Sequence, residues 1–273
     1  MPEGHTLHRL ARELTEAFGG RRVASCSPQG RFAAASLLDG DVLSEGTAWG
    51  KHLFVRFESR PEQVHVHLGL YGAFRFDEAD DPPVVGQVRW RLARPGLTAD
   101  LRGPTACELL MPDEVDRVIG RLGPDPIRKD ADPERFVARV LRSRAPIATL
   151  LMDQAVIAGV GNVYRAEVLF RLGIDPFVPG RELHAKRVRA IWDDLVDLMA
   201  AGVESGRIDT VRPEHEPEAM GRPPREDDHG GEVYVYRRSG MPCWVCGTLV
   251  RTQVMAARNL FWCPRCQRKP RRR

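Results

Sequence analysis

The stretch LLMDQAVIAGVGNVYRAEVLF, residues 150–170, consists of two apolar helical segments joined by a turn that contains two glycines. Gly159 and Gly161 can adopt positive φ angles and allow the backbone to approach a ligand closely. Asn162 is a good N-cap, so we expect the second helix to begin after it, with its first amides facing the turn. The pattern suits a backbone cradle for phosphate. An ordinary helical hairpin with a glycine turn explains the same residues, and from these residues alone it is the favoured interpretation.

The sequence around this stretch, from Pro104 onward, is helical in character. Apolar periodicity predicts further helices at residues 113–121, 133–144, 147–154, 164–172 and 183–202, with short connections rich in glycine and proline. Residues 209–231 have almost no apolar side chains and are expected to form a mobile loop. Two strands are expected beyond this loop, within residues 232–240 and 247–255.

The first hundred residues have a different pattern. Leu7, Leu10, Leu14 and Phe18 recur at helical spacing and predict a helix over residues 6–18, which Gly19-Gly20 should end. Segments 53–57, 64–74 and 88–92 alternate with period two, which predicts an antiparallel sandwich or barrel. A Rossmann arrangement is excluded because no helix of sufficient length fits between these segments.

The composition is that of a globular chain. Its 273 residues are 42% hydrophobic and 29% charged, which excludes collagen and full disorder and allows roughly two domains. No apolar run approaches the ~18 residues of a membrane helix, and the N-terminus has no hydrophobic signal core, so we expect a soluble intracellular protein. Thiols stay reduced in that compartment, where closely spaced cysteines bind metal or react rather than form disulfides.

Four of the six cysteines follow the spacing C-x2-C-x16-C-x2-C. Cys243, Cys246, Cys263 and Cys266 would give one closed, tetrahedral Zn²⁺ site with no position open to substrate, so the metal should be structural. The alternative to a zinc site is a pair of redox-active dithiols, but this spacing disfavours it. Each remaining cysteine is isolated and is expected to be a small buried hydrophobe.

Positive charge is concentrated toward the C-terminus. Residues 230–273 hold ten Lys or Arg side chains against the single acid Glu232, a net charge of +9, whereas the rest of the chain nets −5. This imbalance indicates a polyanionic partner, although a solubilising tail would also explain it. A zinc-stapled hairpin would also hold Arg258 rigidly, which suits gripping a phosphate backbone.

Five motifs, in this order, together resemble the formamidopyrimidine-DNA glycosylase/endonuclease VIII family. They are MPEGHT at the start, WGKHL at 49–53, HLGLYG at 67–72, LLMDQ…IAGVGN at 150–162 and RNLFWCPRCQ at 258–267. The LYG and FWCPRCQ segments are closer to the endonuclease VIII branch, and the PEGHT opening is similar to its actinobacterial members.

The resemblance implies an α+β multidomain fold. An N-terminal catalytic helix and antiparallel β-sandwich would occupy residues 1–112, and a helix–two-turn–helix domain with the mobile loop would occupy residues 113–231. A β-hairpin zinc finger would follow at 232–267, with a basic tail at 268–273.

The resemblance also implies a bifunctional enzyme of base excision repair, a DNA glycosylase with AP lyase activity. Its partner would be double-stranded DNA that contains an oxidised base or an abasic site, with the damaged base flipped out of the duplex. The protein would act as a monomer in the cytoplasm, associated with the nucleoid and without membrane contact. A non-catalytic DNA-damage-binding protein is the alternative, and the catalytic residues below argue against it.

Four residues match the family's catalytic positions. Pro2 becomes the N-terminus if Met1 is removed, and its amine, with a pKa near ~8, would attack C1′ of the damaged nucleoside and form a Schiff base. Glu3 would protonate the sugar oxygen, and Lys51 would contact phosphate and donate a proton in β-elimination. Arg258 would stabilise the leaving phosphate in δ-elimination. Without the resemblance, Pro2 would be explained as a second residue that permits removal of Met1. Lys51 would be explained as an ordinary surface lysine.

Other matches imply DNA contacts. Asn162 and the amides around Gly161 would hold phosphate, and Arg121 would add a further contact. Leu70 and Tyr71 would fill the gap left by the flipped base, although they follow an alternating strand and could instead belong to the sheet core.

The lesion class is predicted from two features of the chain. The LYG and FWCPRCQ segments resemble the pyrimidine-excising branch. Residues 209–231 hold four prolines, which lack the amides that purine-specific relatives use to cap a flipped base. Both features favour oxidised pyrimidines, with 8-oxoguanine or formamidopyrimidine as the alternative substrate.

Overall fold

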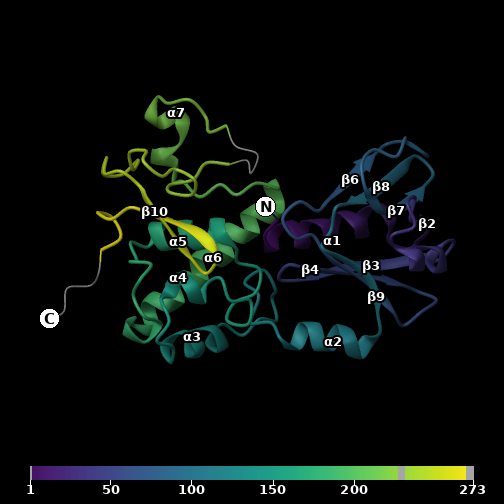
Figure 1. Ribbon diagram of the computed structural model, residues 1–273, viewed down its shortest axis with the longest axis horizontal. Helices are drawn as coiled ribbons and strands as arrows, with labels where there is room; N and C mark the ends of the chain where they lie inside the picture. Colours follow the sequence, from purple (N-terminus) through teal and green to yellow (C-terminus); the bar gives the residue numbers. More distant parts are fainter. Residues whose placement is uncertain (1, 227–230, 269–273) are drawn as a thin grey trace. The chain divides into compact units, whose positions relative to one another are not determined.

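The computed structural model describes residues 2–226 and 231–268 (Figure 1). Helix α1 (Gly4–Phe18) begins the chain, and its predicted stripe of Leu7, Leu10, Leu14 and Phe18 is buried. The helix stops at Gly19, where a Cβ atom would lie 2.5 Å from the carbonyl oxygen of Thr15. The predicted helix and its glycine stop are confirmed.

Two antiparallel sheets form the predicted sandwich. One sheet has the order β1 (Arg21–Arg22), β3 (Val42–Trp49), β4 (His52–Phe57), β5 (Gln63–His67) and β9 (Ala106–Leu110). The other has the order β2 (Ala24–Cys26), β7 (Val88–Arg94), β8 (Leu97–Arg102) and β6 (Ala73–Asp77), and a 3-10 helix, η1 (Ala33–Leu38), precedes β3. Apolar side chains from both sheets, including Val55, Val66, Trp90 and Leu101, share one core with α1.

The predicted strand at 64–74 is instead two strands in different sheets. Strand β5 ends at His67, and the chain turns so that the amide of Gly72 donates to the carbonyl of Leu68 at 3.0 Å. Gly69 makes the turn possible, because its φ is +67° and a Cβ atom there would lie 1.9 Å from Thr105 Oγ1.

The second half of the described chain is mainly helical. Its helices are α2 (Pro112–Gly120), α3 (Pro133–Leu141), α4 (Ile147–Leu150), α5 (Asn162–Arg171) and α6 (Ala185–Ser205), with a 3-10 helix, η2 (Gly180–Glu182), between the last two. Buried residues of α3, α5 and α6, among them Phe136, Tyr164 and Leu195, form a second core.

The turn between α4 and α5 differs in detail from the prediction. Helix α4 ends at Leu150 rather than at residue 154, because the amides of Met152 and Asp153 donate to the carbonyls three residues back, at 3.1 and 3.2 Å, and the helical pattern stops. The side chain of Gln154 donates to Val160 O at 2.9 Å and accepts from Gly159 N at 3.0 Å. Gly159 has the expected positive φ of 85°, whereas Gly161 has a φ of −123° and is itself the N-cap of α5. Asn162 is therefore the first helical residue and not the cap.

The expected loop at 209–231 contains short helices, η3 (Pro213–His215) and α7 (Pro217–Met220), and residues 227–230 of this prediction lie outside the described part of the chain. The predicted strand within 232–240 is wrong. The amides of Tyr234, Val235 and Tyr236 converge on the fully buried carboxylate of Glu167 at 2.7–2.9 Å, so they cannot form a β-ladder. The second predicted strand is present as β10 (Arg251–Met255), which pairs with β11 (Arg258–Trp262).

The chain divides into two units, Met1–Arg121 and Leu122–Arg273. The finer division expected at residues 113, 232 and 268 stays a prediction. Helix α2 belongs to the first unit because it contacts β5 and β9. The zinc hairpin belongs to the second because Leu260 and Phe261 share the core of the helical domain. The expected basic tail beyond Arg268 lies outside the described residues. None of the helices described is long and apolar enough to span a membrane.

Candidate functional site

Helix α1 and strand β3 run antiparallel in the first unit. The amide of Gly20, just past the end of α1, donates to Leu43 O at 2.8 Å. Three residues along β3, Gly46 N donates to Thr15 Oγ1 at 2.8 Å, and a Cβ atom on Gly46 would lie 2.8 Å from Ala11 O. The strand thus proceeds from the end of the helix toward its beginning, and Gly46 permits the close approach.

This arrangement brings Lys51 to the same end of the unit as Pro2 and Glu3. Five extended residues from Gly46 to Lys51 cover about 16 Å, and the eight residues from Ala11 back to Glu3 cover about 12 Å of helix. Lys51 lies in the two-residue turn between β3 and β4, where Trp49 pairs with His52. The three predicted catalytic residues of this unit therefore gather at one end of α1.

Pro2 and Glu3 differ in their surroundings. Glu3 is the N-cap of α1 and is fully buried, and its carbonyl accepts from Thr6 N at 3.0 Å. Pro2 is partly exposed, so the first residue of the processed chain would remain accessible. A helix start with an accessible residue at its tip is suited to a substrate that carries negative charge.

A group of histidines that the sequence did not single out adjoins Lys51. His52 Nδ1 lies 2.9 Å from His65 Nε2, and His65 Nδ1 lies 3.1 Å from Glu108 Oε1. A carboxylate accepts only, so His65 donates from Nδ1, and in its neutral form His65 Nε2 then accepts from His52 Nδ1. Neutral His52 thus carries its lone pair on Nε2.

His67 completes this group on the same sheet face. Its ring centroid is 5.1 Å from that of His52, and its Nδ1 accepts from Gly69 N at 3.2 Å, so its proton is on Nε2. Burial, followed by the charges of His65, His67 and Lys51, lowers the pKa of His52 to about 3. Burial also lowers the pKa of His67. Both imidazoles are therefore neutral at pH 7.

Leu70 and Tyr71 lie in the turn between β5 and β6. Their exposed fractions are 44% and 88%, so neither belongs to the sheet core. Two exposed apolar side chains on a tight turn are suited to insertion between bases. Arg121, also exposed, is the C-cap of α2 at the end of the first unit.

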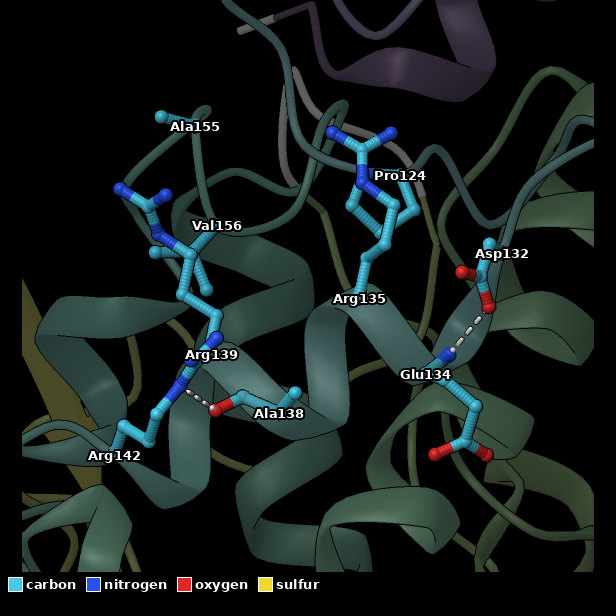
Figure 2. A pocket seen from close by; sticks show the side chains of 9 residues that line it. All are labelled: Pro124, Asp132, Glu134, Arg135, Ala138, Arg139, Arg142, Ala155 and Val156. Atoms are coloured by element: carbon cyan, nitrogen blue, oxygen red, sulfur yellow. Dashed lines mark hydrogen bonds between the residues drawn. The ribbon is translucent and has the colours of Figure 1, made fainter.

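A cavity of about 390 Å³ opens beside α3 in the second unit (Figure 2). It is lined by Pro124, Asp132, Glu134, Arg135, Ala138, Arg139, Arg142, Ala155 and Val156. None of the predicted catalytic or DNA-binding residues belongs to this lining.

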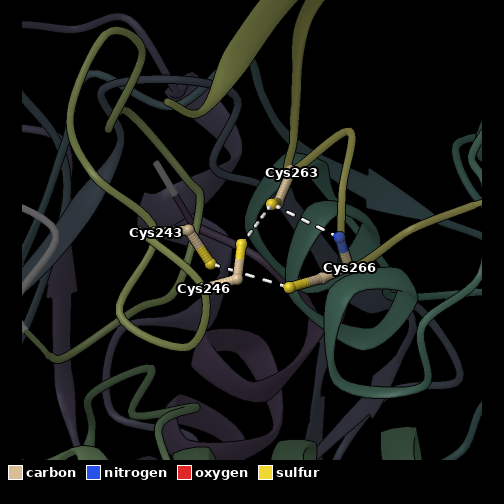
Figure 3. Close-up of side chains that lie close together, drawn as sticks. All are labelled: Cys243, Cys246, Cys263 and Cys266. Carbon is tan, nitrogen blue, oxygen red and sulfur yellow. Dashed lines mark hydrogen bonds between the residues drawn. The ribbon is translucent and has the colours of Figure 1, made fainter. Parts of the chain in front are cut away.

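The four predicted zinc ligands lie together in the second unit (Figure 3). Their sulfur atoms are all within 4.8 Å of one another, with Cys243 3.9 Å from Cys266 and Cys246 3.4 Å from Cys263. Zn–S bonds of ~2.3 Å in a tetrahedron require sulfur separations of about 3.8 Å, so the four thiolates fit one Zn²⁺ ion. All four positions are filled by the chain, and the zinc is structural.

The other two cysteines lie in the first unit. Cys107 is buried as expected, but Cys26 is exposed. Cys26 lies on β2, and the residue of that strand that faces inward is Ser25.

The zinc site supports the hairpin that presents Arg258. This exposed residue begins β11 directly after a two-residue turn, Ala256-Ala257, whose φ angles are both positive at 52° and 55°. Such a turn matches the twist of paired strands, although alanine adopts it less readily than glycine or asparagine. Gln267 anchors the base of the hairpin, since its side chain accepts from Cys263 N at 2.9 Å and donates to Ile174 O at 3.0 Å.

Asn162 joins the start of α5 to the tip of the hairpin. Its Nδ2 donates to the carbonyl of Asn259 at 3.0 Å, and its Oδ1 accepts from buried Arg165. Arg165 also donates to Met255 O at 3.3 Å, so both strands of the hairpin are fixed. Gly161, Asn162 and Arg258 are therefore held at one place in the second unit, with Arg165 as a support that the sequence did not reveal.

Comparison with known proteins agrees with this arrangement. Residues 1–107 match the formamidopyrimidine-DNA glycosylase N-terminal domain, residues 122–212 its H2TH domain, and residues 240–268 the zinc finger found in FPG and IleRS. Endonuclease 8 1 of Mycobacterium tuberculosis is 53% identical over 98% of this chain and 100% of its own length. The structure of the MutM (Fpg) protein of Thermus thermophilus is 29% identical, with a TM-score of 0.74 over 97% of this chain and 98% of that one.

Such extensive similarity defines a DNA repair glycosylase with the fold shared by the Fpg and endonuclease VIII enzymes. The chain belongs to the formamidopyrimidine-DNA glycosylase/endonuclease VIII family, the DNA glycosylases of base excision repair that also cleave abasic sites. Its similarity to the mycobacterial protein is consistent with the actinobacterial endonuclease VIII type.

Proposed function

We propose that this chain excises oxidised pyrimidines from double-stranded DNA through a Schiff base on Pro2 and nicks the strand by β,δ-elimination. The proposal is supported by the antiparallel packing of β3 on α1, which leads the chain to Lys51 at the end of the helix where Pro2 and Glu3 lie. An accessible N-terminal amine is of no use to a protein that only binds DNA. The chain would work as a monomer, at the nucleoid in the cytoplasm.

The chemistry begins at the N-terminal amine. After removal of Met1, the Pro2 nitrogen attacks C1′ of the damaged nucleoside, and the N-glycosidic bond breaks as the base leaves. Glu3 supplies a proton to the sugar ring oxygen as the ring opens, which produces an iminium ion. This ion withdraws electrons and so acidifies the adjacent C2′ position.

The strand is then cut on both sides of the sugar. Loss of a C2′ proton expels the 3′ phosphate in β-elimination, with Lys51 contacting phosphate and supplying a proton. Arg258 stabilises the phosphate that departs in δ-elimination by charge, since an arginine pKa above ~12 makes proton donation slow. The zinc ion supplies rigidity to the hairpin when bound and takes no part in these steps.

DNA is held by groups of both units. Gly161 and Asn162 bind a phosphate at the start of α5, and Arg121 adds a second contact. Leu70 and Tyr71 replace the flipped base in the stack, which offsets an unstacking cost of a few kcal/mol.

Preference for pyrimidines is supported by the backbone of residues 209–226. The amides of His215, Met220 and Arg222 donate to carbonyls of the same segment at 2.8–3.0 Å, and the Arg225 amide donates to Glu232 Oε1 at 2.6 Å. Proline occupies four more positions of residues 209–231. These amides of the described residues 209–226 are already engaged, and the four prolines have none, so we expect the pocket to select bases by how easily they leave the stack.

Borohydride reduction on abasic-site DNA tests the proposal. Wild-type protein should form a covalent protein–DNA adduct, and Pro2→Gly should form at least about ten-fold less because a flexible primary amine replaces the ring nitrogen. Pro83→Gly, in an exposed loop, is the matched control and should trap like wild type. Mass spectrometry of the N-terminus establishes that Met1 has been removed. Absence of trapping by a processed wild-type chain would refute the catalytic proposal.

A further inference from the structure

We propose that the cavity beside α3 binds the sugar-phosphate backbone of duplex DNA outside the lesion, through Arg135 and Arg139. This inference rests on the proposed function, because it assigns a second contact region to the same substrate. The cavity is separate from the residues assigned above to phosphate binding, and its lining lies entirely within the second unit.

One wall of the cavity is cationic. Arg135, Arg139 and Arg142 follow one another at steps of four and three residues on and just beyond α3, so they share one helix face and rise by about 6 Å and 4.5 Å. The opposite face of the helix is buried through Phe136 and Val140. Packing therefore fixes which way the arginines point.

The guanidinium groups of Arg135 and Arg139 are available for a ligand. Within residues 2–226 and 231–268, Arg135 and Arg139 make no hydrogen bond or ion pair through their side chains, and both are exposed. In Figure 2 they extend from α3 in the same direction, on either side of the cavity. Like charges at a spacing of four residues repel each other, and a bound anion would offset that repulsion.

The acidic residues of the lining are already engaged. Asp132 is the N-cap of α3 and accepts from Glu134 N at 2.9 Å. The carboxylate of Glu134 pairs with Arg189 of α6. Neither acid forms an ion pair with Arg135 or Arg139, and the three arginines of the lining outnumber its two acids, so the lining carries a net positive charge.

The other wall is apolar and rigid. Pro124 O accepts from Ala158 N at 3.0 Å, and Gly123 N donates to Gln154 O at 2.8 Å, which fastens residues 123–124 to the turn after α4. A Cβ atom on Gly123 would lie 2.5 Å from the backbone of Val156, so the two backbones are in direct contact. Pro124, Ala155 and Val156 form the surface of this wall.

A wall of arginine facing a wall of apolar atoms suits a strand of nucleic acid. Phosphate oxygens can accept from the guanidinium forks, and deoxyribose rings can pack against Pro124 and Val156. A compact anion such as inorganic phosphate would leave the apolar wall without a partner. Because the apolar wall is part of the turn that leads to Gly161 and Asn162, the same DNA strand can reach both places.

The test is the salt dependence of binding to a duplex that carries a stable abasic-site analogue. Loss of two phosphate contacts in Arg135→Ala/Arg139→Ala should reduce the slope of log K against log salt by about 1.8, since each contact contributes about 0.9. Arg135→Lys/Arg139→Lys retains the charges and should keep most of the slope. The control Arg181→Ala/Lys186→Ala removes two exposed cations of the same unit and should leave the slope unchanged.

Two results would overturn the inference. One is a slope for the double alanine variant equal to that of wild type, and the other is an equal loss in the control. If the double variant does not fold, Arg135→Gln and Arg139→Gln replace it, and each should lose about 0.9 of the slope. Borohydride trapping of wild type separates this question from the catalytic one: absent trapping refutes the proposed chemistry, whereas normal trapping with an unchanged slope refutes only the cavity.

Discussion

At the scale of single residues, the main difference between sequence and structure lies beside Lys51. The sequence WGKHL identifies Lys51 through its family match, but it gives no sign that His52 belongs to a hydrogen-bonded chain. That chain requires Glu108, which lies 43 residues from its partner His65 and reaches it only because β9 pairs with β5. Contacts of this kind depend on sheet register, which alternation alone does not specify.

The neutral state of His52 leads to a prediction about pH. Its pKa is about 3 in the folded protein and ~6.5 when unfolded, so the unfolded chain binds more protons between these values. The free energy of unfolding should therefore be unaffected above pH 6.5 and fall as the pH decreases toward 3. At pH 5 this effect should cost about 1 kcal/mol after allowance for partial exposure.

Urea unfolding of wild type and His52→Gln at pH 7.5 and pH 5 measures this contribution. The variant should lose less stability on acidification than wild type by about 1 kcal/mol. His184→Gln replaces an exposed histidine and should show the wild-type difference. Equal acid sensitivity of wild type and His52→Gln would contradict the prediction.

At the scale of elements, periodicity and spacing predicted most of what was found. The leucine stripe correctly predicted helix α1, and the cysteine spacing correctly predicted the zinc site. Both patterns lie within a short part of the chain. The strand predicted within 232–240 failed for a non-local reason, since Glu167 of α5 takes its amides. Alternating apolar residues show that a segment is buried, but not which partner satisfies its backbone.

We expect the zinc hairpin to depend on its metal for DNA binding. Wild type should contain one zinc ion per chain, and Cys263→Ser should lose it, because three thiolates leave the tetrahedral site incomplete. DNA affinity should fall at least about ten-fold in the same variant, since Arg258 is presented by strand β11, which ends one residue before this cysteine.

Metal analysis and DNA titration measure the two effects. Cys26→Ser is the matched control, because this cysteine is exposed and lies in the first unit, and it should keep both zinc and affinity. Full DNA affinity in a zinc-free Cys263→Ser protein would separate the metal from DNA binding and contradict the prediction.

At the scale of the whole chain, the family resemblance predicted the fold class, and the antiparallel sheets, the helical core and the two-stranded zinc hairpin are all present. The composition of residues 209–231 predicted a mobile loop, and the resemblance placed a zinc finger after it at residues 232–267. In the structure, Phe261 packs among the residues of the helical core, and Arg222 forms an ion pair with Glu232 at 2.8 Å across the intervening segment. Trp244, within the zinc site, has Arg222 and Arg238 stacked on its ring at 4.4 and 3.6 Å. These contacts make the segment part of the second unit.

That integration bears on which lesion the enzyme removes. The described part of this segment is held by its own amides, by the ion pair of Arg222 with Glu232 and by stacking of Arg222 on Trp244, and we expect these contacts to oppose its folding over a flipped purine. The enzyme should then select lesions by the free-energy cost of moving the base out of the stack, which is low for damaged pyrimidines that stack weakly.

Single-turnover assays on duplexes with thymine glycol, 5-hydroxyuracil or 8-oxoguanine in one sequence context test this preference. Both pyrimidines should be excised at least about ten-fold faster than 8-oxoguanine, a difference of ~1.4 kcal/mol in activation free energy. Pro2→Gly supplies the background rate for each duplex. Faster excision of 8-oxoguanine than of both pyrimidines would contradict the assignment and favour the formamidopyrimidine type.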